Sequence, residues 1–155
     1  MNKILEAAIA RARETMNANI GGPFGAAIID DKGNILSVSS NSVLRDNDPT
    51  AHAEVNAIRE ACRKVGTYDL SGCILYTTAY PCPMCLSAII WANIKKVYFG
   101  CRASDAAKIG FRDDFIYRFI EQKCADQDVM SLKELDREAC LELFQEYEKQ
   151  QKIIY

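Results

Sequence analysis

The chain has 155 residues, of which 49% are hydrophobic and 26% are charged, so it fits one domain and is not a disordered or low-complexity protein. Its 19 basic and 21 acidic residues leave a net charge of −2, which favours neither a nucleic acid nor a membrane as its partner. No apolar run approaches the roughly 20 residues that cross a bilayer. We also find no secretory signal at the N-terminus, and we therefore expect a soluble, cytoplasmic protein.

The hydrophobic periodicity predicts a single α/β domain over residues 1–155. An amphipathic helix over residues 4–16 is followed by Gly21-Gly22-Pro23, and strands over 24–29 and 35–40 form a hairpin. A helix over 51–64, a strand over 73–78, a helix over 81–92 and a strand over 96–99 then alternate. This alternation favours a mostly buried sheet covered by helices.

The pattern weakens after Gly100 and returns near the C-terminus. Ser131 and Glu134 form a capping-box pattern, which predicts that the last helix begins there. The predicted apolar stripe of this helix comprises Leu132, Leu135, Ala139, Leu143, Phe144 and Tyr147.

The cysteines and the single histidine define the candidate chemistry. Seven cysteines without a secretory signal argue against a disulfide framework. Cys82 and Cys85 lie three positions apart at the start of a predicted helix, so both thiols can face one ion. His52 precedes another predicted helix and can add an imidazole. One neutral nitrogen and two thiolates suit Zn²⁺, and a three-residue ligand set leaves the fourth tetrahedral position for water.

Glu54 decides between a structural and a catalytic site. It follows His52 by two positions, near enough to reach a zinc-activated water without binding the metal. A carboxylate there can take a proton from the water and return it to a leaving group. The combination predicts a hydrolase that attacks an electron-poor carbon.

Each motif alone is also compatible with a function other than a catalytic zinc site. A Cys-x-x-Cys pair can be a redox pair or a structural zinc knuckle, and a Cys–His nucleophile pair would leave Glu54 unexplained. A structural zinc module would need a fourth ligand, which Cys62, Cys73 or Cys101 could supply in principle.

Both motifs together resemble the signature of the zinc-dependent nucleobase and nucleoside deaminases. Further segments are similar to the small bacterial guanine deaminases of the cytidine-deaminase fold: 19–25, 47–55, 73–77, 81–86, 104–107, 110–117 and the terminal Tyr155. The resemblance implies a three-layer α/β/α fold with a mixed central sheet of about five strands. It also implies a homodimer in which the segment from about 131 to 155 is exchanged between subunits.

The resemblance assigns roles to matching positions. His52, Cys82 and Cys85 would hold Zn²⁺, and Glu54 would move protons as hydroxide attacks C2 of guanine, releasing ammonia and leaving xanthine. Asp113 would assist near the exocyclic amino group, although its neighbour Asp114 is an alternative. The substrate-binding residues would be Asn41, Phe24, Trp91 and, from the partner subunit, Tyr155.

One position departs from the family pattern. Many relatives carry a glutamate before Pro-Cys-x-x-Cys, where this chain has Tyr80. A phenol instead of a carboxylate beside the zinc helix can change the pocket's polarity. Cytosine, guanosine and an aminotriazine such as ammeline therefore remain alternative substrates. A tRNA adenosine deaminase needs a phosphate-binding surface, which the net charge does not favour.

Overall fold

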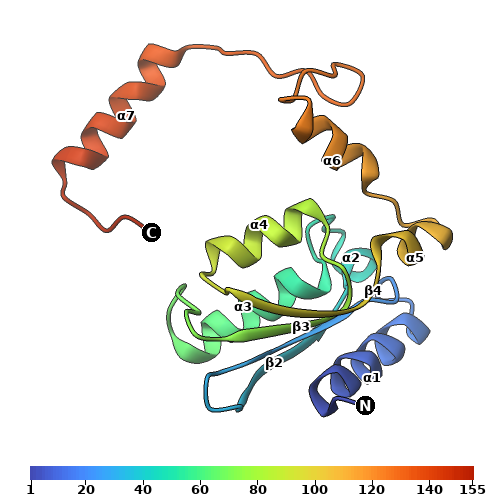
Figure 1. Ribbon diagram of the computed structural model, residues 1–155. Coiled ribbons are helices and arrows are strands. Elements are labelled where there is room, and N and C mark those ends of the chain that lie inside the picture. Colours follow the sequence, from blue (N-terminus) through green and yellow to red (C-terminus); the bar gives the residue numbers. More distant parts are fainter. The chain divides into compact units, whose positions relative to one another are not determined.

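A computed structural model describes residues 1–155 (Figure 1). The chain divides into two compact units, Met1–Ile116 and Tyr117–Tyr155, and α6 runs across their boundary. The elements are α1 (Lys3–Asn17), β1 (Gly25–Ile29), β2 (Ile35–Ser40), α2 (Val43–Asp46), α3 (Ala53–Val65), β3 (Ile74–Ala79), α4 (Pro83–Trp91), β4 (Lys96–Cys101), α5 (Ala103–Lys108), α6 (Asp114–Glu121) and α7 (Arg137–Lys149).

The first unit is built on a mixed sheet with the strand order β2-β1-β3-β4. β1 is antiparallel to both of its neighbours, whereas β3 and β4 are parallel. The expectation of about five strands is wrong, since the sheet has four. After β4 the chain enters α5, whose start is fixed by a hydrogen bond from the Arg102 backbone N–H to Asp105, and then α6, so no further strand is added.

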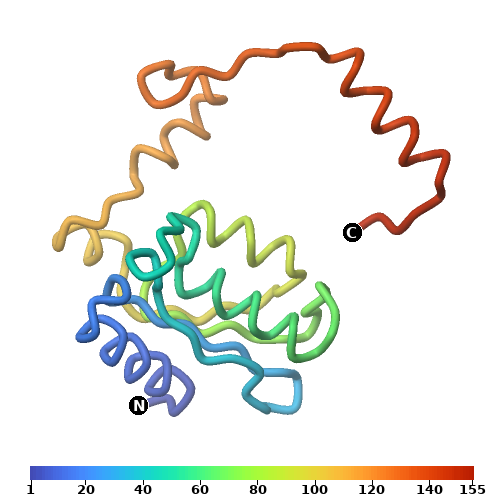
Figure 2. Tube along the Cα trace, turned by 180° about the vertical axis from the view of Figure 1, so that it is seen from behind, coloured from blue at the N-terminus to red at the C-terminus, as the bar shows by residue number.

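Helices cover both faces of this sheet, which confirms the three-layer α/β/α arrangement. α1 packs on one face, and α3 packs on the other beside α4 (Figures 1 and 2). All five residues of β1 are buried, because both faces of this central strand are covered. The core between the sheet and α3 is made of small and branched side chains such as Ala57, Leu75 and Ile28.

The predicted helices of the first unit begin and end within a few residues of their expected positions. Asn2 caps α1 by accepting hydrogen bonds from the backbone N–H groups of Ile4 and Leu5. His52 and Cys82 are the residues immediately before α3 and α4, and both have extended backbone. The two motifs singled out in the sequence thus lie at helix N-termini, as predicted.

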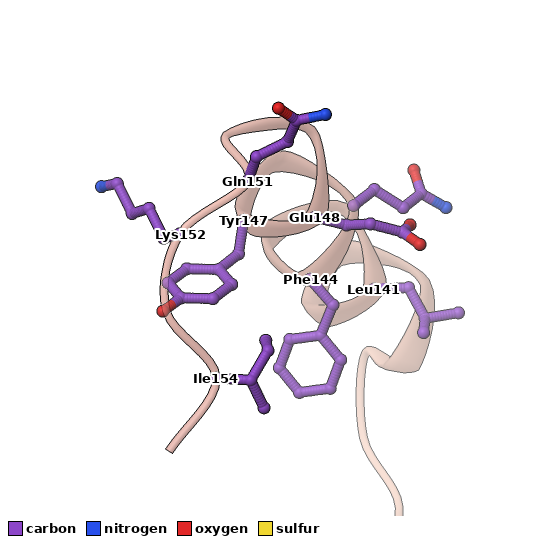
Figure 3. Close-up of a pocket in the computed structure, with 8 residues that line it drawn as sticks. Leu141, Phe144, Tyr147, Glu148, Gln151, Lys152 and Ile154 are labelled. Atoms are coloured by element: carbon purple, nitrogen blue, oxygen red, sulfur yellow. The ribbon is translucent and has the colours of Figure 1, made fainter.

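The second unit contains α7, which begins five residues later than a capping box with Ser131 as the N-cap predicts. Asp136, the residue before the helix, has a left-handed backbone with φ 50° and ψ 39°, so the helix cannot extend back to Ser131. Beyond α7 the chain folds back along the helix. The Tyr147 hydroxyl donates to the carbonyl of Ile153, and Phe144 and Ile154 face each other (Figure 3).

None of the helices combines the length and the apolar character that a membrane crossing requires.

The close approach of α1 to β1 is testable at Gly25. A Cβ at this position would lie 2.1 Å from the carbonyl oxygen of Ala8. We expect Gly25→Ala to lower the free energy of unfolding by about 1–3 kcal/mol or more, because helix and strand must separate. Gly33→Ala is the control: its φ of +88° strains any side chain, but nothing lies within 4 Å. Equal melting temperatures for the two variants would contradict the close packing.

Candidate active site

The imidazole of His52 and the thiols of Cys82 and Cys85 meet at one point. The Nδ1 atom of His52 lies 3.5 Å from each cysteine sulfur. All three ligand atoms lie within 4.8 Å of one another. Residues 30 positions apart in the sequence meet because α3 and α4 pack side by side with their N-termini at the same end.

The charges of this cluster follow from its surroundings. Cys85 donates toward Cys82 and His52 lies beside it, which together lower the pKa of Cys82 to about 4. The same contact with Cys82, together with burial, raises the pKa of Cys85. The hydrogen bond to Cys82 raises the pKa of His52. These shifts favour the charged forms of Cys82 and His52, and the partial positive charge of the helix N-termini further stabilises a thiolate.

This donor set fits a tetrahedral zinc ion. With Zn–S near 2.3 Å and Zn–N near 2.0 Å, neighbouring ligand atoms lie about 3.6 Å apart, close to the two separations of 3.5 Å seen here. No fourth His, Cys, Asp or Glu atom joins the group. Cys62, Cys73 and Cys101 are free thiols outside it. The three side chains could therefore hold a metal whose fourth position is open to another molecule.

Glu54 is a buried carboxyl group beside this cluster, only 6% exposed. Its Oε1 atom lies 3.0 Å from the Thr77 hydroxyl, and its Oε2 atom lies 3.4 Å from the Cys85 sulfur. Burial raises the pKa of Glu54, although its own backbone N–H and the Thr77 hydroxyl act in the opposite direction. Perturbed carboxyl groups of this kind are typical of catalytic sites.

The cluster opens into a cavity of about 820 Å³ in the first unit. Its walls come from the loop before β1, the end of β2, α2, the starts of α3 and α4, and the segment 103–116. The carboxyl ends of the parallel strands β3 and β4 lead to this region, which is where ligands bind in open α/β sheets.

Two of the predicted substrate-binding residues line this cavity. Asn41 is buried, and its Oδ1 atom accepts from the backbone N–H groups of Gly22 and Val43. These bonds fix the orientation of its amide. Phe24 packs edge-on against Phe111 with ring centroids 5.0 Å apart, and both rings line the cavity.

The remaining predicted residues separate into two groups. Asp113 lines the cavity, where burial and the nearby Cys82 raise its pKa, whereas Asp114 forms an ion pair with Arg112 at 3.0 Å. Trp91 ends α4 with 73% of its surface exposed and is not among the cavity-lining residues, so in this chain it does not form the expected wall. Tyr155 belongs to the second unit, and its action on a partner's site stays a prediction.

Sequence reasoning missed three features of the site. Thr77 contacts Glu54, and its signal was a polar residue on the otherwise apolar buried face of β3. Phe111 lines the cavity but lies in a segment without clear periodicity. Asn56 donates from its side chain to the carbonyl of Ser40, tying the start of α3 to the end of β2.

The comparisons with known proteins agree with this geometry. The family model described as the cytidine and deoxycytidylate deaminase zinc-binding region matches residues 1–101. Guanine deaminase of Bacillus subtilis is 50% identical over 125 residues, covering 81% of this chain and 80% of the relative. A tRNA-specific adenosine deaminase of Aquifex aeolicus is 51% identical over 77 residues, which are half of each chain.

Solved structures give the same result. The X-ray structure of guanine deaminase from Bacillus subtilis has a TM-score of 0.90 and 43% identity, covering 100% of this chain and 99% of that one. Guanine deaminase from Nitrosomonas europaea has a TM-score of 0.67 and 32% identity, covering 71% and 63%. With its His–Cys–Cys cluster, adjacent buried carboxyl group and matching zinc-binding region, the chain belongs to the cytidine and deoxycytidylate deaminase family.

Proposed function

We propose that the protein is a zinc-dependent deaminase that hydrolyses guanine to xanthine and ammonia. The observation that carries this proposal is the buried carboxyl of Glu54 next to the His52–Cys82–Cys85 cluster, at the edge of a cavity large enough for a nucleobase. Guanine as the substrate is supported by the Bacillus subtilis relative, whose match extends over four fifths of this chain.

His52, Cys82 and Cys85 would hold the zinc ion. When bound, zinc activates a water molecule as a nucleophile at neutral pH. Three protein ligands leave room for that water, and for this reason a purely structural zinc site is less well supported.

Glu54 would move the protons. Its Oε2 atom faces the cluster, so this oxygen is placed to take one proton from the attacking water and deliver it to the ring nitrogen. It would then take the second proton, from the hydroxyl formed on the attacked carbon, and deliver it to the amino group that leaves as ammonia. Burial of the carboxyl keeps competing water away from the transferred proton. Asp113 lines the same cavity and would assist at the amino group, which favours it over Asp114.

Asn41 and Phe24 would bind the base. Because the Oδ1 atom of Asn41 is held by two backbone N–H groups, the Nδ2 group is left to donate to an acceptor on the purine. Phe24 and Phe111 present an apolar wall for the flat ring.

Because Tyr80 stands where many relatives have a glutamate, other amino-substituted rings remain alternative substrates. It lines the cavity and packs edge-on against Phe99 with centroids 5.0 Å apart, so it narrows the space beside the cluster without adding charge. Cytosine, guanosine and ammeline require the same metal chemistry. The tRNA-specific relative matches only half of this chain and supports the reaction class more than an RNA substrate.

We also propose a homodimer in which the C-terminal segment is exchanged and Tyr155 covers the partner's site. α7 has no buried residue, and Leu143, Phe144 and Ile154 are more than half exposed. Exposed apolar side chains on both an amphipathic helix and its tail are typical of a surface that another chain covers.

The substrate is tested by ammonia release from the zinc-loaded protein with guanine, cytosine, adenine, guanosine and ammeline in parallel. We expect guanine to have the highest kcat/KM. A preference for another base would retain the roles of His52, Glu54, Cys82 and Cys85 and reassign the substrate. No turnover of any base would overturn the proposed activity.

Glu54→Gln should abolish most turnover without removing zinc, because the residue moves protons but is not a ligand. General acid–base catalysis contributes about 10²–10⁴-fold, and we expect a loss of that size in kcat. Glu60→Gln is the matched control, since Glu60 lies on the same helix and accepts a hydrogen bond from Ser39. Zinc content is measured by elemental analysis, and near-normal turnover by Glu54→Gln would contradict its role.

Deleting residues 151–155 should reduce turnover, because the proposed cover over the partner's site is lost. Mixing this deletion with Glu54→Gln subunits tests the exchange. Each mixed dimer would contain one site with both an intact Glu54 and a tail from the other subunit, so we expect activity to recover. Unchanged activity of the deletion variant, or no recovery after subunits have exchanged, would contradict the proposed arrangement.

A further inference from the structure

Glu54 and Thr77 are two buried polar side chains that contact each other. Thr77 is 1% exposed and Glu54 is 6% exposed, and their oxygens lie 3.0 Å apart. A buried hydroxyl or carboxyl costs free energy unless it is hydrogen-bonded. Their contact therefore stabilises both groups, but it also determines where the carboxyl points.

The strand geometry explains why Thr77 reaches Glu54. Alternate residues of β3 are buried, and Leu75, Thr77 and Ala79 share one face. Leu75 packs in the core with residues of α3, the helix whose first turn carries Glu54. Thr77 is thus the polar member of an otherwise apolar row, directly opposite the start of the helix. A central strand bonded on both sides holds this position rigidly.

We propose that Thr77 is a positioning residue for the reaction: its hydroxyl fixes Oε1 of Glu54 so that Oε2 faces the His52–Cys82–Cys85 cluster. This inference rests on the proposed function, since it assigns the proton transfer to one oxygen of Glu54. The two oxygens have different neighbours, Thr77 for Oε1 and Cys85 for Oε2. Only the Oε2 position is next to the cluster. A half-turn of the carboxylate merely exchanges two equivalent oxygens, but a partial rotation about its terminal bond would turn the oxygen at this position away from the cluster.

A hydroxyl is suited to this position because it can donate to Oε1 of Glu54 whether or not the carboxyl carries a proton on Oε2. The Thr77 oxygen also lies 3.1 Å from the carbonyl oxygen of Ala79. When Glu54 is a carboxylate, Thr77 can donate to it. When Glu54 carries the transferred proton on Oε2, its Oε1 atom can still accept from Thr77. The contact is therefore kept while the proton moves, without a change in heavy-atom positions.

The test compares Thr77→Val, which keeps the shape and removes the hydroxyl, with Thr77→Ser, which restores it. Loss of a group that orients a catalytic side chain costs about 10–100-fold in activity. We expect Thr77→Val to lower kcat by this factor with KM within about twofold, and Thr77→Ser to recover most of kcat. Zinc content should be unchanged in both variants, because neither substitution removes a ligand.

Thr78→Val is the matched control. Thr78 is the next residue of the same strand, and its hydroxyl accepts from the backbone N–H of Gly25 on the opposite side from Glu54. Its loss removes one hydroxyl contact from β3 without touching the carboxyl. If Thr77→Val and Thr78→Val lowered kcat equally, Thr77 would be merely structural, and the proposal would be overturned. Wild-type kcat in Thr77→Val would overturn it as well.

A second readout separates this inference from the proposed activity. The side-chain carboxyl carbon of Glu54, assigned by its loss in Glu54→Gln, is followed by ¹³C NMR in the absence of substrate. We expect this resonance to shift in Thr77→Val and to stay in place in Thr77→Ser and Thr78→Val. A resonance unaffected by Thr77→Val would refute the contact, whereas failure of the wild type to deaminate any base would refute the proposed activity alone. If Thr77→Val does not fold, Thr77→Ala and Thr77→Ser provide the same comparison.

Discussion

The packing of α3 beside α4 on one face of the sheet is the constraint on which the site depends. It brings two helix N-termini to one place, so that His52 lies 3.5 Å from the sulfurs of both Cys82 and Cys85. His52 and Cys82 immediately precede these helices, and Cys85 lies in the first turn of α4. A metal bound there would join the two helices, and metal binding would therefore also stabilise the fold.

The second feature of the site is that the candidate metal ligands, His52, Cys82 and Cys85, are separate from the buried carboxyl group of Glu54. Glu54 lies in the first turn of α3, two residues after His52. Its carboxyl nevertheless points toward the sheet, where it contacts Thr77 and is shielded from water. The cavity beyond it has mostly apolar walls with a few polar groups, including Asn41 and Asp113. Such a pocket binds a flat heterocycle by its faces and orients it by a small number of hydrogen bonds.

Several sequence-based expectations were wrong for reasons of tertiary context. Ser131 and Glu134 match a capping box, but Asp136 takes a left-handed backbone and α7 begins only at Arg137. The family resemblance assigned Trp91 to the base pocket, whereas in this structure Trp91 ends α4, away from Cys82, and is not among the residues that line the cavity. Local patterns show where a helix can begin or which side chains are apolar, and they contain no information on which end of an element meets the site.

The sequence by itself determined the ligand types, their spacing and the placement of both motifs at helix N-termini, because capping signals and a three-residue spacing are local properties. The pattern also predicted an α/β domain with a mostly buried sheet covered by helices, since alternating strands and helices have few ways to bury their apolar faces. The three-layer order was implied by the family resemblance. Only the tertiary structure decided that three ligands converge without a fourth, that Asp113 rather than Asp114 lines the cavity, and that Thr77 contacts Glu54. These facts depend on the packing of segments far apart in the chain, which no local pattern encodes.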